Sequence, residues 1–386
     1  MLYLRSGSLF LAVVVTEGCR WALYAGRDAV DAKELWTSSS HGLLRQSFAP
    51  QHLPDVDAQL AFDPAKNLVR NHEVNQDGWG IGWYEYHNPL SHGASAGRPR
   101  ELHRRRSGSG ATEAGHGSGG STHHPRPDLA LAQLLASRAA SSKVIFSHIR
   151  AATDTRVRSS ENAHPFSFNR LLWMHNGSVR HQTALQDEVI ASLARNGGCP
   201  ATGSSGGGGG AAEKGAAAAA KLVHGTTDSE YAGALFASFL DPSKGAVCDR
   251  ERFGLEELAA AMQRTVQRIQ RDDRCVDNDG DGAPDGSSLN FAVSDGRHVV
   301  AVRYRTCRHE EPPSLYYALD EAAGKFWCAS EPLDKTESNK AGRRWVLMAK
   351  DQMVTFDTTT GAFNTKCLSE ACEAEVLRRS TRRAEL

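Results

Sequence analysis

Short apolar runs bounded by polar loops are the feature that most restricts how this chain of 386 residues can fold. Each run has the length of a buried strand, and the set comprises Gly80–Tyr84, Val144–His148, Leu171–His175 and the hairpin-like pair Asn290–Val293 and Val299–Tyr304. Ser229–Phe239 and Leu255–Ile269 instead carry apolar residues three or four positions apart, which predicts helices. Strands before and after a helical middle indicate an α+β fold with sheet layers sandwiched by helices in one large domain.

Two stretches lack the apolar side chains that a core requires. Residues 99–128 pass from an arginine triplet into Gly, Ser and His, and residues 196–220 contain runs of Gly and Ala. We expect both to be mobile surface insertions. Deleting 104–124 or 200–218 is therefore expected to leave folding and activity nearly intact.

The charge balance and the first residues of the chain bear on two questions: which macromolecules the protein binds, and whether it is secreted. Forty-five basic and forty-five acidic residues balance, so nucleic acid and membrane are not expected as partners. The run Leu9–Val15 is at the lower limit for a signal-peptide core and far too short to span a bilayer. We expect residues 1–18 to be a short removable leader or a wrongly set start, with secretion as the less favoured alternative.

The eight cysteines are scattered without a repeated spacing, and no CxxC pair occurs among them. Structural zinc sites need four ligands at recognisable spacings, so we expect no metal, and no cofactor either. Reduced thiols in a cytoplasmic protein are the favoured interpretation.

Cys19 is the candidate nucleophile, since it directly precedes a strand-like apolar run. The sequence leaves two candidates for the base that takes its proton. One is a histidine, namely His148, His164 or His175, and the other is the α-amine of Cys19 itself, if Cys19 begins the mature chain. An α-amine has a pKa near 7.7–8.0, which suits a base at neutral pH. The flanking residues favour the second, because papain-like cysteines lie in a different local context.

Five further residues can recognise an amide substrate with a free amino-acid end. Asn176 and Gly177 can form an oxyanion hole, although an Asn-Gly pair is more often a turn. Arg150 can pair with an α-carboxylate, to which Thr153 can also donate; the alternative for Arg150 is a structural ion pair. Asp228 can bind an α-ammonium, and its alternative is an ordinary helix N-cap. Together they describe a site for a glutamyl head group.

The order of these motifs resembles that of the class II glutamine amidotransferases, which are N-terminal-nucleophile hydrolases. The similarity is greatest to the branch that contains the amidotransferase-like subunit of the fungal glutathione-degrading complex. The matching motifs are Cys19-Arg20-Trp21, Gln46-Ser47-Phe48, Asn75-x-Asp77-Gly78-Trp79-Gly80, His148-x-Arg150-Ala151, Asn162-x-His164-Pro165-Phe166, Met174-His175-Asn176-Gly177, Gly225-Thr226-Thr227-Asp228-Ser229-Glu230, Ser288-Leu289-Asn290-Phe291-Ala292-Val293 and Ala329-Ser330-Glu331-Pro332-Leu333.

The resemblance implies a four-layer αββα fold over residues 19–360, followed by a tail at 361–386. It assigns Cys19 as nucleophile and base, Asn176 and Gly177 as oxyanion hole, and Arg150 and Asp228 as substrate clamp. The glycine-rich motif adds Asp77 and Gly78 to the expected substrate site. The chain departs from the branch in one respect, since eighteen residues precede Cys19. Cleavage at Gly18–Cys19 or a misplaced start would reconcile the two.

The expected activity is hydrolysis of a γ-glutamyl amide through a thioester on Cys19. The substrate would be glutamine, glutathione or a related γ-glutamyl compound, and the resemblance implies a metallopeptidase-like partner subunit. Two alternatives remain: a glutaminase subunit that delivers ammonia to a separate synthase, and a non-catalytic subunit that binds glutamine or glutathione.

Overall fold

The structure is a computed structural model of the chain. It describes residues 19–47, 78–86, 99–107, 112–113, 126–127, 129–137, 140–150, 160–196, 217, 219, 222–273, 286–308, 310–334 and 343–384.

A seven-stranded antiparallel sheet forms the first half of the core. Its order is β13-β11-β12-β1-β6-β2-β3, so that β1 lies at the centre. The strands are β1 (Arg20–Asp31), β2 (Gly78–Tyr86), β3 (Pro99–Ser107), β6 (Ser141–Arg150), β11 (Tyr316–Asp320), β12 (Lys325–Ala329) and β13 (Trp345–Leu347). β4 (Thr112–Glu113) and β5 (Arg126–Pro127) form a separate short pair.

A six-stranded antiparallel sheet of order β15-β14-β10-β9-β8-β7 packs on the first. Its strands are β7 (Phe166–Phe168), β8 (Leu171–Ser178), β9 (Ser288–Ser294), β10 (His298–Arg303), β14 (Gln352–Asp357) and β15 (Phe363–Cys367). Alternate side chains of β1 and β8, including Trp21, Leu23, Leu172 and Met174, meet in the core between the two sheets.

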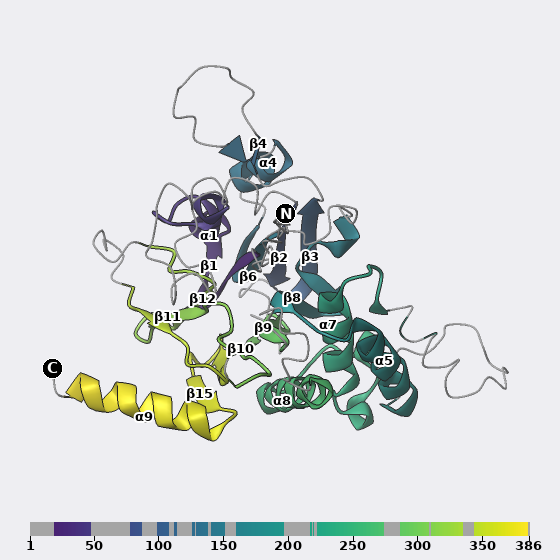
Figure 1. Ribbon diagram of the computed structural model, residues 1–386. Helices are drawn as coiled ribbons and strands as arrows, with labels where there is room; N and C mark the ends of the chain where they lie inside the picture. Colours follow the sequence, from purple (N-terminus) through teal and green to yellow (C-terminus); the bar gives the residue numbers. More distant parts are fainter. Residues whose placement is uncertain are drawn as a thin grey trace, which may run out of the picture.

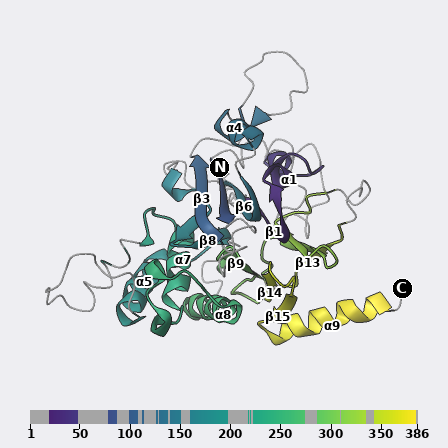
Figure 2. The same cartoon turned by 180° about the vertical axis from the view of Figure 1, so that it is seen from behind.

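Helices cover both outer faces. The first sheet carries α1 (Lys33–Trp36), α2 (Leu43–Gln46) and α4 (Leu129–Ser137), and the second carries α5 (Gln182–Asn196), α7 (Asp228–Ser238) and α8 (Leu255–Asp272). Single 3₁₀ turns occur at Ser160–Asn162, Pro242–Lys244 and Val247–Asp249. Figure 1 shows α5, α7 and α8 together on one side and α1 and α4 on the other, and the view from behind shows the same order (Figure 2). The layers are thus αββα, which confirms the expected fold.

The expected strands and helices are all present, with ends that differ by a few residues. The turn at Asp295-Gly296 joins β9 to β10, which pair antiparallel as expected. No described helix is long and apolar enough to cross a membrane.

Two of the expected boundaries are wrong. Residues 99–107 of the first expected insertion form β3, which pairs with β2 along its length and closes one edge of the first sheet. This strand was not recognised in the sequence because it lacks an apolar run. As an edge strand it can instead carry charged residues such as Arg104, Arg105 and Arg106. Residues 363–367 of the expected tail form β15, which pairs with β14. Most of residues 108–125 and 197–216 lie outside the described residues, as do residues 1–18.

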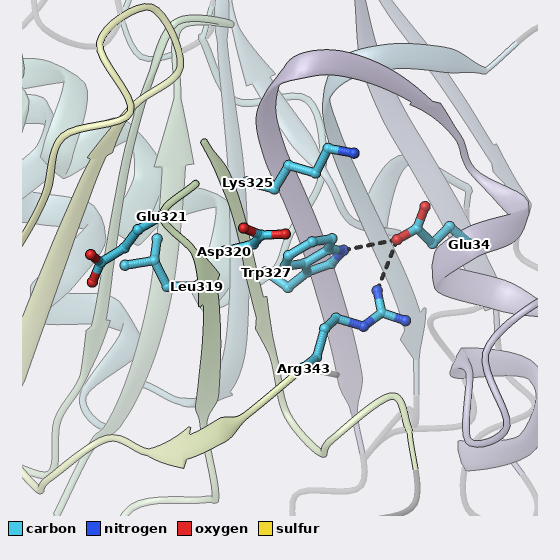
Figure 3. Close-up of a pocket in the computed structure, with 7 residues that line it drawn as sticks. All are labelled: Glu34, Leu319, Asp320, Glu321, Lys325, Trp327 and Arg343. Atoms are coloured by element: carbon cyan, nitrogen blue, oxygen red, sulfur yellow. Dashed lines mark hydrogen bonds and ion pairs between the residues drawn. The ribbon is translucent and has the colours of Figure 1, made fainter. Parts of the chain in front are cut away.

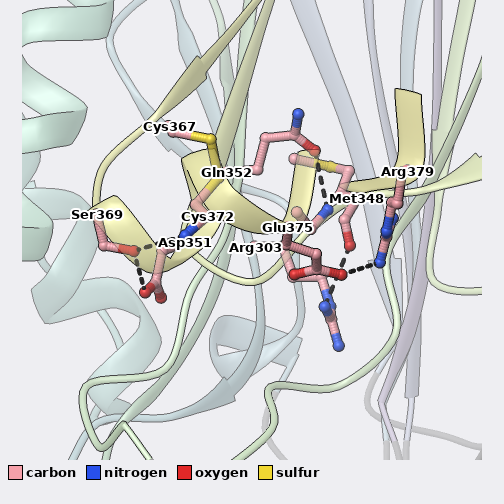
Figure 4. The surroundings of a disulfide bond; sticks show 10 residues. Arg303, Met348, Asp351, Gln352, Cys367, Ser369, Cys372, Glu375 and Arg379 are labelled. Atoms are coloured by element: carbon pink, nitrogen blue, oxygen red, sulfur yellow. Dashed lines mark hydrogen bonds and ion pairs between the residues drawn. A yellow bond between two sulfur atoms is a disulfide. The ribbon is translucent and has the colours of Figure 1, made fainter. Parts of the chain in front are cut away.

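The expectation of reduced thiols is also wrong. Cys367 and Cys372 form a disulfide, and Cys248 and Cys307 are disulfide-bonded as well. Cys19 and Cys328 are thiols. The Cys367–Cys372 bond ties β15 to α9 (Glu370–Ala384), and Ser369 beside it donates to Asp351 at 2.8 Å (Figure 4). From there α9 runs toward the C-terminus (Figures 1 and 2), and Arg379 of this helix donates to the carbonyl oxygen of Leu347 at the end of β13.

Candidate active site

Cys19 lies directly before β1, the central strand of the first sheet. It is half-buried and directly precedes β1, as the sequence predicts for a nucleophile at a strand start. Arg20 follows it, and the Arg20 guanidinium donates to the carbonyl oxygen of Cys19 at 2.9 Å. The first residue of β1 therefore holds the backbone of Cys19 in place.

Arg150 ends the strand next to β1 and lies at the same end of the sheet as Cys19. Arg20 pairs with Ile149, and Trp21 pairs with His148, so the next residues outward are Cys19 and Arg150. Side chains alternate along a strand, and Trp21 faces the second sheet, so Cys19 and Arg150 are directed to that side too. Arg150 is 9% exposed, and on its other side it pairs with Gly78 of β2.

Asn176 and Gly177 approach from the second sheet, near the end of β8. Asn176 continues the alternation of Leu172 and Met174, and therefore faces the first sheet. Its side-chain Nδ2 donates to Ser330 Oγ at 3.4 Å. Gly177 has φ +146°, and a Cβ there would lie 2.1 Å from the Ser288 carbonyl oxygen, so this position requires glycine.

Asp228, the first residue of α7, contacts the chain directly after β8. Its Oδ2 accepts from the backbone N–H of Val179 at 2.6 Å, and its Oδ1 accepts from that of Ser229 at 2.7 Å. The alternative role of an N-cap falls to Thr227, whose side chain accepts from Glu230 N. Asp228 is instead the first residue of the helix, and its carboxylate fixes the chain just after Gly177.

The structure thus brings Cys19, Arg150 and Gly78 to the same end of three adjacent strands of the first sheet, facing Asn176 and Gly177 on the second. Asp228, at the start of α7, lies close to them because its carboxylate accepts from the backbone N–H of Val179, two residues after Gly177. Thr153 and Asp77 lie outside the described residues.

The three histidines that could have served as base are deeply buried between these elements. Burial lowers the pKa of His148 to about 3 and that of His164 well below its ordinary value of 6.5, and it lowers the pKa of His175 as well. Both ring nitrogens of His175 are engaged, one with Ser229 Oγ at 2.9 Å and one with the Ser288 carbonyl at 2.8 Å. His148 stacks on His164 with ring centroids 4.1 Å apart. All three rings are therefore neutral at pH 7 and unsuited to act as the base.

A buried ionic network beneath Cys19 was missed by sequence reasoning. The Glu331 carboxylate accepts from Arg20 Nε at 2.9 Å and contacts His41 Nε2 at 2.7 Å. Glu331 is fully buried, and Arg20 and His41 are each 1% exposed. Two features of the sequence could have indicated this network. Arg20 begins an apolar strand, and an acidic residue, Glu331, closely follows another apolar strand.

A pocket also lies elsewhere in the molecule. It has a volume of about 650 Å³ and is formed by the β11–β12 turn, α1 and Arg343. Its lining comprises Glu34, Leu319, Asp320, Glu321, Lys325, Trp327 and Arg343 (Figure 3). Glu34 accepts from both Trp327 Nε1 at 3.2 Å and Arg343 Nη1 at 2.8 Å. None of the predicted site residues lines this pocket.

One group of metal-ligating type occurs among the described residues. Glu85, Glu101 and His103 of the β2–β3 hairpin place their ligand atoms within 4.8 Å of one another. Both carboxylates are largely exposed and the group is separate from Cys19. It adds nothing to the candidate active site.

Comparison with known proteins gives a consistent picture. No family model matches the chain. The chain is 27% identical over 349 residues to a protein of Saccharomyces cerevisiae described as probable glutamine amidotransferase DUG3, covering 88% of this chain and 77% of that protein.

Two solved structures are also similar. One is a glutamine aminotransferase class-II domain protein from Silicibacter pomeroyi, with a TM-score of 0.44 and 18% identity over 90% of this chain and 99% of that one. The other is the glutamine phosphoribosylpyrophosphate amidotransferase of B. subtilis, with a TM-score of 0.44 and 12% identity over 91% of this chain and 50% of that one.

Proposed function

Because the chain is similar over most of its length to a probable glutamine amidotransferase, we propose that it is a class II glutamine amidotransferase that hydrolyses a γ-glutamyl amide through a thioester on Cys19. The observation that carries this proposal is the placement of Cys19 and Arg150 at neighbouring strand ends, facing Asn176 and Gly177 on the opposite sheet. A thiol, a fixed cation and two oxyanion donors are the groups that such a reaction needs.

The reaction starts when the Cys19 sulfur attacks the carbonyl carbon of the side-chain amide. The α-amine of Cys19 takes the thiol proton and later gives it to the departing nitrogen. Asn176 Nδ2 and the backbone N–H of Gly177 stabilise the oxyanion that forms between these two steps. Water then cleaves the γ-glutamyl thioester and returns the thiol.

The residues proposed to recognise the substrate lie near the same strand ends as Cys19. Arg150 binds the α-carboxylate with both prongs of its guanidinium, and Thr153 donates to the same group. Asp228 binds the α-ammonium. Gly78 pairs with Arg150, and Asp77 is proposed to belong to the same substrate site. These contacts read only the glutamyl end, so glutathione and other γ-glutamyl peptides are proposed as substrates alongside glutamine.

The proposed setting is the breakdown of glutathione with a metallopeptidase-like partner subunit. The relative from Saccharomyces and the motifs at Ser288–Val293 and Ala329–Leu333 support this choice of branch. A free α-amine on Cys19 requires removal of residues 1–18, which we propose as the maturation step.

A glutamine-like electrophile tests the nucleophile. It is expected to label Cys19 in the native protein and to abolish hydrolysis, whereas Cys328 stays unlabelled, because full burial raises the pKa of the Cys328 thiol. Cys19→Ala is expected to lose hydrolysis and still bind glutamine or a γ-glutamyl peptide by calorimetry. Intact mass of the active protein is expected to show Cys19 as the first residue.

Three outcomes would redirect the proposal. Hydrolysis by Cys19→Ala would place the nucleophile elsewhere. Binding without labelling or turnover in the wild-type protein would favour a non-catalytic binding subunit. Turnover of glutamine but not of γ-glutamyl peptides would favour a glutaminase subunit that supplies ammonia.

A further inference from the structure

Ser330 connects the two halves of the candidate active site. Its hydroxyl oxygen accepts from the backbone N–H of Trp21 at 3.1 Å and from Asn176 Nδ2 at 3.4 Å. Its own backbone N–H donates to the Trp21 carbonyl at 2.9 Å. One side chain therefore touches both the strand that carries Cys19 and the amide proposed as oxyanion donor.

The amide of Asn176 depends on this contact for its orientation. Asn176 is 1% exposed, and its Oδ1 has no hydrogen-bond partner among the described residues. An Asn amide nitrogen carries two hydrogens, so that with one directed at Ser330 the other remains for an oxyanion. Loss of the Ser330 hydroxyl would leave the amide free to rotate about its last side-chain bond.

The residue after Ser330 fixes the other side of the same junction. Glu331 binds Arg20 and His41, and Arg20 in turn holds the Cys19 carbonyl at 2.9 Å. Gln46 Nε2 donates to the His41 carbonyl at 2.9 Å, which joins α2 to the network. A buried carboxylate is tolerated because it has such partners, and its rigid hydrogen bonds hold the turn that presents Ser330.

We propose that Ser330 is a positioning residue that orients Asn176 relative to Cys19. This inference rests on the proposed roles of Cys19 and Asn176. Ser330 makes no contact with the reacting atoms in this scheme. It acts through Asn176. The hydrogen bonds of Glu331 with Arg20 and His41 hold Ser330 in place beside β1, the strand that follows Cys19.

A double-mutant cycle tests the proposal. Ser330→Ala is expected to lower kcat roughly ten- to a hundredfold with little change in KM, because a misdirected oxyanion donor weakens the transition state alone. Asn176→Ala is expected to lower kcat about a hundred- to a thousandfold. In the Asn176→Ala background, Ser330→Ala should cost less than about threefold, since the group that it orients is already gone.

Ser314→Ala is the matched control. The Ser314 hydroxyl donates to the Ser330 carbonyl at 2.8 Å, but no contact joins it to Asn176 or Trp21 among the described residues. This variant removes a hydroxyl that also contacts Ser330 and is expected to keep kcat within about twofold of the wild-type value. Thermal unfolding of every variant checks that the compared proteins are folded.

The outcomes separate this inference from the proposed function. Full additivity in the cycle would mean that Ser330 supports β1 through Trp21 rather than Asn176, and would overturn the inference. An unchanged kcat in Ser330→Ala would overturn it as well. Hydrolysis by Cys19→Ala would instead overturn the proposed function, whatever the cycle shows.

Discussion

The neutral histidine His148 makes the stability of this protein depend on pH. Burial holds the pKa of His148 at about 3 in the folded state, below its ordinary value of 6.5. Between these two values the unfolded chain binds a proton that the folded chain does not. The free energy of unfolding is therefore expected to fall by about 1.4 kcal/mol per pH unit from this residue as the pH drops below 6.5.

Urea unfolding at pH 7, 6 and 5 measures this dependence. His148→Gln cannot take up the proton, so its stability should decline less steeply than that of the wild-type protein over the same range. His164 and His175 remain in both proteins, and burial, the first cause of their lowered pKa values, acts on them in both. Parallel slopes for the two proteins would contradict a neutral His148 in the folded state.

At the scale of elements, strand β3 shapes the candidate active site although the sequence places it in an insertion. Arg106 donates to the carbonyls of Glu161 at 3.0 Å and Ala163 at 2.8 Å, next to His164. Burial lowers the pKa of Arg106 to about 10, which leaves it charged at neutral pH. Arg106→Met is expected to destabilise the protein by about 1.5–3 kcal/mol, the usual range for hydrogen bonds from a charged group.

Arg105 provides the control on the same strand, because it points to the opposite face and is exposed. Arg105→Met should change the free energy of unfolding by no more than about 0.5 kcal/mol in urea titrations. Equal losses in the two variants would show that charge on β3 matters and that the contacts to residues 161–163 do not.

The disulfide between Cys367 and Cys372 anchors α9 to the edge of the second sheet. Cys372 is 1% exposed, whereas Leu377, farther along the helix, is 66% exposed. Replacing both cysteines by serine is expected to cost about 2 kcal/mol, as the loop-closure estimate gives for so short a loop. The loss should be local to α9.

Hydrogen exchange followed by mass spectrometry locates that loss. Amides of α9 are expected to exchange faster in the double-serine variant, while those of β14, which pairs with both β10 and β15, stay protected. Identical exchange of α9 in the two proteins would mean that side-chain packing alone holds the helix.

For the whole molecule, the corrected boundaries change which deletions should be tolerated. Removing residues 116–122 or 201–214 leaves every described strand intact and is expected to shift the free energy of unfolding by less than about 0.5 kcal/mol. Removing 104–124 takes away half of β3 with Arg104 and Arg106, and should cost more than about 2 kcal/mol. Chemical denaturation of the three variants makes the comparison. Equal stability of the 104–124 and 116–122 deletions would show that β3 is dispensable.

The sequence by itself determined the elements and the candidate residues. Runs such as Val144–His148 and Leu171–His175 are buried on both faces, so their near-continuous apolar character identified them as strands before any pairing was known. Cys19, Arg150, Asn176 and Asp228 were identified by motif order, because each role demands a particular residue type beside a strand or helix end. Local chemistry was sufficient to select these candidates, and their roles stay a prediction.

Tertiary structure alone decided how those residues meet and what holds them. Ser330 reaches Asn176 across 154 residues of chain, and Glu331 reaches Arg20 across 311, and no local pattern encodes pairings so distant. In the sequence, the arginines of residues 104–106 are typical of a solvent-exposed loop. In the fold, Arg106 donates to the carbonyl oxygens of Glu161 and Ala163. Cys367 and Cys372 lack a recognisable spacing, and only the fold brings their Cα atoms to 5.5 Å. The reason is the same in each case: a polar side chain's role depends on the partner that packing places beside it.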